Sequence, residues 1–266
     1  MEQKKPNVAI SFDDGRQDNV AIIKRLVANH IPATLYVATG YVDRSCHPDL
    51  LPTDKPAMRP NDVVQLFQDP SVEIGMHGDM HLNEDSDISK GREKLLNWLD
   101  LEPNDPLGFA SPGTSFSIPV FLQSQNALYT DEIAYLAMGL RIKKFRRIRT
   151  ICRKIARVIP DAYLFKTAYH DTLMQTCPDR VIYRVPVLRS TTSGQVISLL
   201  RKAIKTRSSV VLMFHSIGRN PHDDVWTWDS KKFENVCAYL QKERDNDKVN
   251  LCTVMQVFQA LQERSV

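Results

Sequence analysis

The sequence predicts an α/β fold built around a parallel sheet. Strand-like runs of apolar residues alternate with helix-like amphipathic runs along most of the chain, which is the pattern of repeated βα units. Several of the strand-like runs are apolar without a break, as in Val210-Val211-Leu212, which indicates strands that are covered on both faces. With 266 residues, of which 42% are hydrophobic, the chain is long enough to bury one large core.

The individual elements follow from the same periodicity. The expected strands are residues 7 to 13, 33 to 38, 72 to 77, 108 to 112, 181 to 188, 209 to 215 and 249 to 254. The expected helices are residues 18 to 29, 61 to 68, 88 to 100, 194 to 206, 230 to 243 and 255 to 263. No repeat or low-complexity stretch interrupts this order, so we expect a single domain over residues 1–266. The pattern alone does not distinguish an open sheet from a barrel.

The first expected strand ends in Asp13-Asp14-Gly15. Open α/β sheets and barrels carry their functional groups at the carboxyl ends of parallel strands. Two adjacent carboxylates at such an end can divide the work, one binding a metal ion and the other accepting a proton. Because neighbours in a strand point to opposite faces, a bend at Gly15 is needed to bring both inward. An Asp-Asp-Gly turn is also an ordinary way to end a strand, so this motif is informative only with a second one.

The second motif is His77-Gly78-Asp79-Met80-His81, which follows the expected strand at residues 72 to 77. Two histidines four residues apart lie on the same side of a helical turn, within reach of one metal ion. Together with Asp14 they would leave coordination positions open, which is typical of a catalytic rather than a structural site. The two motifs in combination predict a divalent-metal hydrolase.

With these motifs, the sequence resembles the polysaccharide deacetylases of the nodulation type, the NodB homology domain of carbohydrate esterase family 4. Further segments that carry the resemblance are Pro32 to Val37, Glu73-Ile74-Gly75, Phe109 to Gly113 and Val210 to Ile217. The resemblance covers nearly the whole chain and is weakest from about Gln123 to Val181. It implies a distorted (β/α)7 barrel of the polysaccharide-deacetylase type.

The resemblance also implies a role for each motif residue. Asp13 would be the general base, and His215, at the end of an apolar strand, would be the general acid. Asp14, His77 and His81 would bind one divalent metal ion, usually zinc.

Substrate-binding residues are implied less directly. A backbone N–H in the Ser111 to Thr114 segment, around Pro112 and Gly113, would stabilise the oxyanion of the tetrahedral intermediate. Apart from the resemblance, the Trp226-Thr227-Trp228 stretch could stack on a sugar ring, with Trp226 as the candidate, although tryptophans more often simply bury area in the core.

The sequence departs from the family pattern at the third and fourth motifs. Ala110 stands where the family has an arginine that orients the catalytic aspartate, and Gly113 stands where a tyrosine is usual. Arg184 or Lys166 could supply the missing positive charge from another strand. Asp171 is the candidate for the aspartate that supports the acid histidine.

With these residues, the resemblance implies a metal-dependent N-deacetylase that acts on an amino sugar of an intracellular glycan precursor or of a cell-surface polysaccharide intermediate. The substrate would be an N-acetylated sugar, a sugar nucleotide or a lipid-linked saccharide. Two alternatives remain open. The same residues could hydrolyse another C–N amide, such as a formyl group, or the chain could be a carbohydrate-binding domain that has lost turnover, which Ala110 and Gly113 favour.

A basic segment forms the second distinctive feature. Residues 141–157 hold nine lysines and arginines and no acidic residue, and without these nine the formal net charge of +4 becomes −5. Apolar residues recur within it at steps of three and four, which predicts an amphipathic helical insertion around residues 141–159. It could dock on an anionic membrane surface, contact a substrate phosphate, or be a solvated face. Charge alone is too little to predict nucleic-acid binding.

The expected compartment is the cytoplasm, at or near the inner face of the membrane. The chain enters its first strand without the apolar stretch of a secretory signal. Its five cysteines are odd in number and contain no Cys-x-x-Cys pair, which favours reduced thiols over a disulfide framework.

Overall fold

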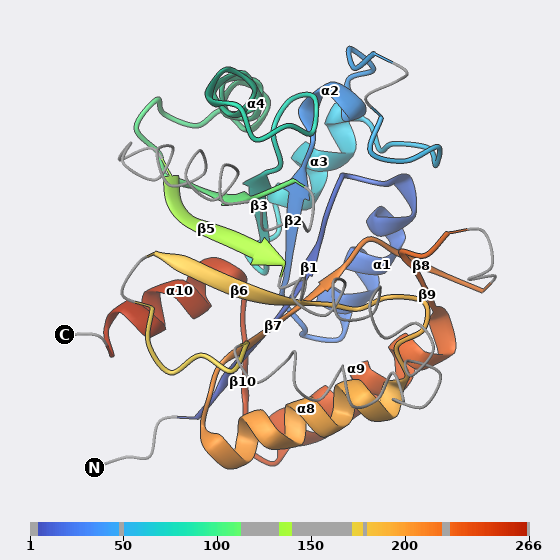
Figure 1. Ribbon diagram of the computed structural model, residues 1–266, viewed down its shortest axis with the longest axis vertical. Helices are drawn as coiled ribbons and strands as arrows, with labels where there is room; N and C mark the ends of the chain where they lie inside the picture. The colour runs from blue at the N-terminus through green and yellow to red at the C-terminus, as the bar shows by residue number, and fades with distance from the viewer. Residues whose placement is uncertain are drawn as a thin grey trace, which may run out of the picture.

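The computed structural model describes residues 5–47, 51–112, 133–139, 172–177, 180–219 and 224–264 (Figure 1). Its centre is a ring of parallel strands: β1 (Asn7–Phe12), β2 (Ala33–Val37), β3 (Val72–Met76), β4 (Leu107–Ala110), β5 (Ile133–Gly139), β6 (Val181–Pro186) and β7 (Val210–Phe214). Each strand pairs with the next, and β7 pairs with β1 along its whole length, from Val210 beside Val8 to Phe214 beside Phe12. The described strands therefore form a closed parallel seven-stranded barrel, as the family resemblance implies.

Helices cover the outside of this barrel (Figure 1). They are α1 (Gln17–Ala28), α2 (Thr39–Val42), α3 (Pro60–Phe67), α4 (Asp85–Leu99), α8 (Ser193–Thr206) and α9 (Ser230–Asp245). Their buried faces, with Ile23, Leu95 and Phe233 among them, join one large apolar cluster with outward-facing strand residues such as Ile10 and Leu212. A short pair of strands, β8 (Ser216–Gly218) and β9 (Thr227–Asp229), lies beyond the carboxyl end of β7.

The inside of the barrel is filled by small and aromatic side chains and is covered by the last helix, α10 (Val254–Gln262). The small side chains of Ala9, Ala110 and Ala137 leave room there for the rings of Tyr36 and Tyr135. Thr253 begins α10 by accepting a hydrogen bond from the backbone N–H of Gln256. One end of the barrel is thereby packed shut, and the polar motifs lie at the other end.

The structure differs from the sequence prediction at two strands. Strand β5 was not predicted, because Ile-Ala-Tyr-Leu-Ala-Met-Gly is poor in the β-branched residues that mark a strand. The run at residues 249 to 254 contains only a two-residue strand, β10 (Asn250–Leu251), which pairs with Asn7 and Val8 beside the ring. The seven expected strands thus included β10, which pairs only with the start of β1, and did not include β5, which is needed to close the barrel.

Three further sequence predictions concern the cysteines, membrane-spanning segments and the basic helix. Four cysteines in the described part of the chain, Cys46, Cys177, Cys237 and Cys252, are free thiols. None of the helices that the structure describes is both long enough and apolar enough to span a bilayer. The expected basic helix at residues 141–159 lies outside the described residues.

Candidate active site

The two aspartates of the first motif lie in a sharp bend after β1. Asp13 continues the strand by one hydrogen bond, from its N–H to the carbonyl of Phe214 at 3.0 Å. Asp14 and Gly15 then take left-handed backbone angles, with φ of 77° and 90°. The bend that the sequence requires therefore begins at Asp14, one residue before the glycine. Both carboxylates are buried as a result, Asp13 at 2% exposure and Asp14 at 1%.

The two histidines of the second motif lie in a loop and not on a helical turn, so that part of the prediction is wrong. Gly78 and His81 have φ of 78° and 59°, which interrupt any helix between them. The loop is held by the carboxylate of Asp87, which accepts hydrogen bonds from three backbone N–H groups, those of Asp79, Met80 and Leu82, at 2.6 to 3.1 Å. This loop still brings the two rings together, with centroids 4.7 Å apart.

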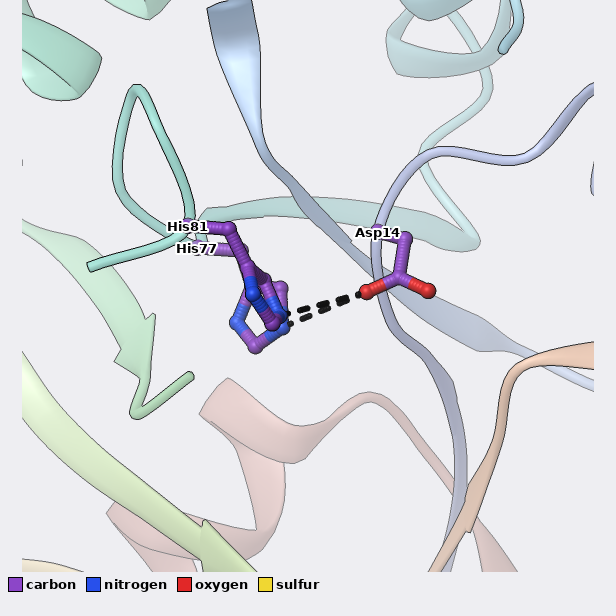
Figure 2. Close-up of side chains that lie close together, drawn as sticks. All are labelled: Asp14, His77 and His81. Carbon is purple, nitrogen blue, oxygen red and sulfur yellow. Dashed lines mark ion pairs between the residues drawn. The ribbon is translucent and has the colours of Figure 1, made fainter. Parts of the chain in front are cut away.

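Asp14, His77 and His81 converge on one point (Figure 2). One oxygen of Asp14, Oδ1, lies 3.6 Å from Nε2 of His77 and 3.5 Å from Nε2 of His81. All three donor atoms lie within 4.8 Å of one another. Nδ1 of His77 donates to the carbonyl oxygen of Ala110 at 2.8 Å, which leaves Nε2 as the free lone pair. Two imidazoles and one carboxylate in this arrangement fit a divalent ion such as zinc.

The other oxygen of Asp14 is bound by Arg16. Its Nε donates to Oδ2 of Asp14 at 2.8 Å, and its Nη1 donates to Asp224 at 2.8 Å and to Ser216 at 3.1 Å. Burial alone would raise the pKa of Asp14. The histidines around it and Arg16 outweigh that effect and hold the pKa well below its usual value.

Asp13 is paired with Arg184, which crosses the barrel from β6. The guanidinium donates to both carboxylate oxygens, at 2.5 and 3.0 Å, and lies over the ring of Tyr36 at 4.8 Å from its centroid. Arg184 therefore lies where the sequence prediction needed a positive charge. Burial would raise the pKa of Asp13, and the charge and hydrogen bonds of Arg184 together with the charges of His77 and His215 more than offset it, so the carboxyl stays ionised. The other candidate, Lys166, lies outside the described residues.

A chain of polar side chains continues from Arg184 through the inside of the barrel. The hydroxyl of Tyr36 bonds that of Tyr135 at 2.8 Å, and Tyr135 donates to the carboxylate of Glu73. The second oxygen of Glu73 accepts from Thr34 at 2.8 Å and from the N–H of Met255, in the first turn of α10, at 2.9 Å.

The third histidine, His215, follows β7 directly. Its ring packs on that of Trp226, with centroids 4.3 Å apart. Burial lowers the pKa of His215 from its usual value, although the nearby aspartates act in the opposite direction. Within the described ranges its Nδ1 has no hydrogen-bond partner. The residue predicted to support it, Asp171, lies outside those ranges.

Ser111 and Pro112 lie beside the histidines, but neither offers a free backbone donor for an oxyanion. The N–H of Ser111 already donates to the carbonyl of Ala137 at 3.1 Å, and proline has none. Asn83 holds this segment from both sides, since it accepts from the Ser111 hydroxyl and donates to the carbonyl of Pro112. A donor from this segment would have to be Gly113 or Thr114, which lie outside the described residues.

These side chains line a single pocket at the carboxyl ends of the strands. It contains most of the predicted site residues: Asp13, Asp14, His77, His81, Ser111, Arg184, His215 and Trp226. It also contains four that the sequence did not suggest: Arg16, Pro52, Gly139 and Met213. Of the two tryptophans in the Trp-Thr-Trp stretch, only Trp226 faces the pocket, whereas Trp228 is fully buried and donates to the carbonyl of Thr191.

Comparison with known proteins agrees with this geometry. The sequence profile of the polysaccharide deacetylase family matches residues 1–100, which include both motifs. A search of curated proteins gave no match.

Solved structures are similar to this chain at low sequence identity. A family 4 acetyl xylan esterase from Clostridium thermocellum, solved with a cobalt ion, is 13% identical with a TM-score of 0.50 over 95% of this chain and 90% of that one. A polysaccharide deacetylase from Bacillus cereus gives 11% identity and a TM-score of 0.48, over 94% and 91% of the two chains. A family 4 carbohydrate esterase from Streptomyces lividans, solved with acetate, gives 11% and 0.48, over 94% and 93%. The likeness to the acetyl xylan esterase, at 13% identity, concerns the fold alone.

The fold and the site together define a (β/α)7 barrel with a candidate metal centre at the carboxyl ends of its strands. The profile of the polysaccharide deacetylase family matches the part of the chain, residues 1–100, that carries Asp14, His77 and His81, and the fold resembles that of a family 4 acetyl xylan esterase.

Proposed function

We propose that this protein is a metal-dependent hydrolase that removes an N-acetyl group from an amino sugar. The observation that carries the proposal is the pocket itself. It brings an Asp-His-His cluster, a second buried carboxylate and a third histidine together within one cleft. A carboxylate beside a metal centre and a histidine opposite it are the acid–base pair that amide hydrolysis requires.

The metal would be held by Asp14, His77 and His81, with zinc as the proposed ion. When bound, it would supply Lewis-acid polarisation of the acetyl carbonyl and a water nucleophile at neutral pH. Asp13 is not part of that cluster and is kept ionised by Arg184, so it is free to accept the proton of the attacking water. Because burial lowers the pKa of His215, its protonated form is a stronger acid than free imidazole and gives its proton readily to the departing amine.

We propose a precursor in the cytoplasm as the substrate, either a sugar nucleotide or a lipid-linked saccharide. Trp226 offers a flat face next to His215, on which a sugar ring can stack. Leu51 and Val225 are the exposed large apolar side chains of the described residues, at 42% and 47% exposure. Each is the sequence neighbour of a pocket residue, Pro52 and Trp226, which supports an apolar contact at the mouth and favours the lipid-linked form.

Contact with the membrane would be made by the basic segment at residues 141–157. Its nine positive charges support attraction to anionic lipid, worth about 1 kcal/mol for each residue near the surface. Sedimentation with vesicles of phosphatidylglycerol should therefore deplete the protein from solution, and a variant with these lysines and arginines changed to glutamine should remain in solution. Equal sedimentation of the two would remove the segment from the proposal.

The central experiment is metal analysis of the purified protein, followed by assay of acetate release from N-acetylated sugars, sugar nucleotides and lipid-linked saccharides. We expect about one divalent ion per chain and release of acetate that stops on chelation. His77→Ala should abolish both metal binding and activity, and Asp13→Asn should abolish activity alone. His47→Ala, at an exposed histidine, is the matched control and should change neither.

The same experiment separates the alternatives. Activity on formylated but not acetylated sugars would assign another C–N amide. A protein that binds sugar and metal but releases no acyl group from any of them would be a carbohydrate-binding domain. Acetate release that survives both chelation and Asp13→Asn would contradict the mechanism.

A further inference from the structure

Arg16 is the one buried arginine of the pocket that neither the sequence motifs nor the proposed chemistry uses. Its side chain is 1% exposed, although it stands at the start of a surface helix. The backbone on both sides is fixed, because Gly15 accepts a hydrogen bond from the N–H of Met58 at 3.0 Å and Gln17 donates to Pro56 at 2.8 Å. Because its backbone is fixed and its side chain is buried, the guanidinium of Arg16 has a defined orientation in the pocket.

The guanidinium links two carboxylates that belong to different parts of the site. Toward the metal cluster, Nε binds the outer oxygen of Asp14, and this leaves the inner oxygen facing both histidines. Toward the pocket wall, Nη1 binds Oδ2 of Asp224. The other oxygen of Asp224 accepts from the N–H of Trp226 at 2.9 Å, and the Trp226 ring packs on His215. A continuous path of contacts therefore runs from a metal ligand to the proposed acid.

The charge and the geometry of Arg16 have opposite effects on a bound cation. Its positive charge repels a divalent ion, so loss of the charge alone would strengthen metal binding. Its planar fork, by contrast, fixes the direction of Asp14, and partners that orient a metal ligand strengthen binding. A lysine keeps the charge but cannot present the fork, which makes the two effects separable.

We propose that Arg16 is a positioning residue that directs one oxygen of Asp14 toward the metal and couples metal binding to the placement of Trp226 over His215. The inference rests on the proposed metal site and goes beyond it, since it assigns a joint role to Arg16 and Asp224. Neither residue contacts the reacting atoms. Both act through a neighbour, Arg16 through Asp14 and Asp224 through Trp226.

The first test measures Zn²⁺ and Co²⁺ affinity by competition with a chelator. If orientation dominates, Arg16→Lys weakens binding by about 10-fold to 100-fold, the usual effect of losing a partner of a metal ligand. If charge alone matters, Arg16→Lys binds as tightly as the original protein and Arg16→Gln binds more tightly, which would overturn the proposal. The visible spectrum of the Co²⁺ form gives a second readout, which should change in Arg16→Lys because the geometry at the ion changes.

The second test addresses the coupling through a residue outside the metal cluster. Asp224→Asn should weaken metal binding several-fold in the original protein and have little further effect in an Arg16→Lys background, because the path then no longer passes through Arg16. Metal addition should change the tryptophan fluorescence of the original protein. This change should be lost in Trp226→Phe and reduced in Asp224→Asn.

Outcomes for this inference and for the proposed function are distinguishable. Equal metal affinity and equal fluorescence response in Asp224→Asn and the original protein would overturn the coupling while leaving the deacetylase proposal intact. A folded original protein that binds no divalent ion would overturn the metal site and both proposals. Because Arg16→Lys carries a risk of misfolding, thermal unfolding is measured in parallel, and the affinity of Asp224→Asn, whose side chain is partly exposed, tests the path independently.

Discussion

The adjacent aspartates Asp13 and Asp14 share burial and sequence context but have different surroundings. Arg184, from β6, donates to both oxygens of Asp13, whereas Arg16, in the loop that follows, donates to only one oxygen of Asp14. The free oxygen of Asp14 faces His77 and His81. Each carboxylate thus has its own arginine, and the way each arginine binds it, at two oxygens or at one, sets what the carboxylate can do.

The comparison shows how a fold gives two identical side chains different surroundings. Both pKa values are lowered, so the charge of the two groups does not distinguish them. The two carboxylates differ in which oxygen lone pairs remain available and in the direction of those lone pairs. Substitutions at the aspartates and their arginines test this distinction.

The largest effect is expected from the aspartates themselves. Asp13→Asn should lower kcat by about 10²-fold to 10⁴-fold, the usual contribution of a general base, and should leave metal affinity near its original value. Asp14→Asn should instead lower metal affinity and lose activity with it. Metal content measured beside kcat separates the two variants. Metal loss in Asp13→Asn, or full metal retention in Asp14→Asn, would reverse the assignment.

Arg184→Met should have the next largest effect, on stability. The substitution leaves Asp13 buried without its partner, which typically costs about 3 to 5 kcal/mol in the free energy of unfolding. Arg201→Met is a matched control, because Arg201 also lies over a tyrosine ring, that of Tyr239, but on the exposed surface of α8. Denaturant unfolding should show a change for Arg201→Met of less than about 0.5 kcal/mol. Equal effects at the two sites would mean that Arg184 contributes only its ring contact.

The pH dependence of stability should have opposite signs at the two ends of the barrel interior. The pKa of Asp13 is lowered from 3.8, so its contribution is complete above pH 3.8 and is lost as the pH falls below that value toward the folded pKa. Burial raises the pKa of Glu73 from 4.5, so its contribution is complete below pH 4.5 and is lost as the pH rises through the folded pKa. With chelator present, unfolding curves from pH 2 to 8 should show a weaker acid loss for Asp13→Asn. Glu73→Gln should instead gain relative stability on the alkaline side.

The smallest effect is expected from Tyr36→Phe. It keeps the ring beneath Arg184 and removes only the hydroxyl that bonds Tyr135. Loss of one such hydrogen bond should lower the free energy of unfolding by about 1 kcal/mol. If Arg184 is held mainly by Asp13, kcat changes little. A kcat loss as large as that of Asp13→Asn would show that the tyrosine hydroxyl takes part in orienting the base.

Much of this architecture could be predicted from the sequence because its signals are local. Uninterrupted apolar runs predicted most barrel strands to within a few residues, and the two motifs predicted the residues that converge at the strand ends. Strand β5 was not predicted because its alanines and its glycine have low strand propensity. Its extended conformation depends on pairing with β4 and β6 in the closed ring.

The rest of the site depends on side-chain orientations that are determined by contacts with distant residues and not by the local sequence. The histidine loop was expected to be helical because the spacing fits a helix, and the carboxylate of Asp87, which determines the actual loop, comes six residues after His81. Arg184 was one of two candidates, and the choice required knowing that β6 lies next but one to β1 in the closed ring. Arg16 directly follows the first motif, yet its inward direction depends on Asp224, more than two hundred residues away in the chain.

The hydrogen bond between Glu73 and the first turn of α10 has a consequence for assembly. Residues 254–262 follow every barrel strand in the chain, and they bury Tyr135 and Val211 from below. Without this helix, the side chains of Tyr135 and Val211 would lose part of their cover. The support beneath Arg184 is therefore complete only once α10 has docked against the barrel.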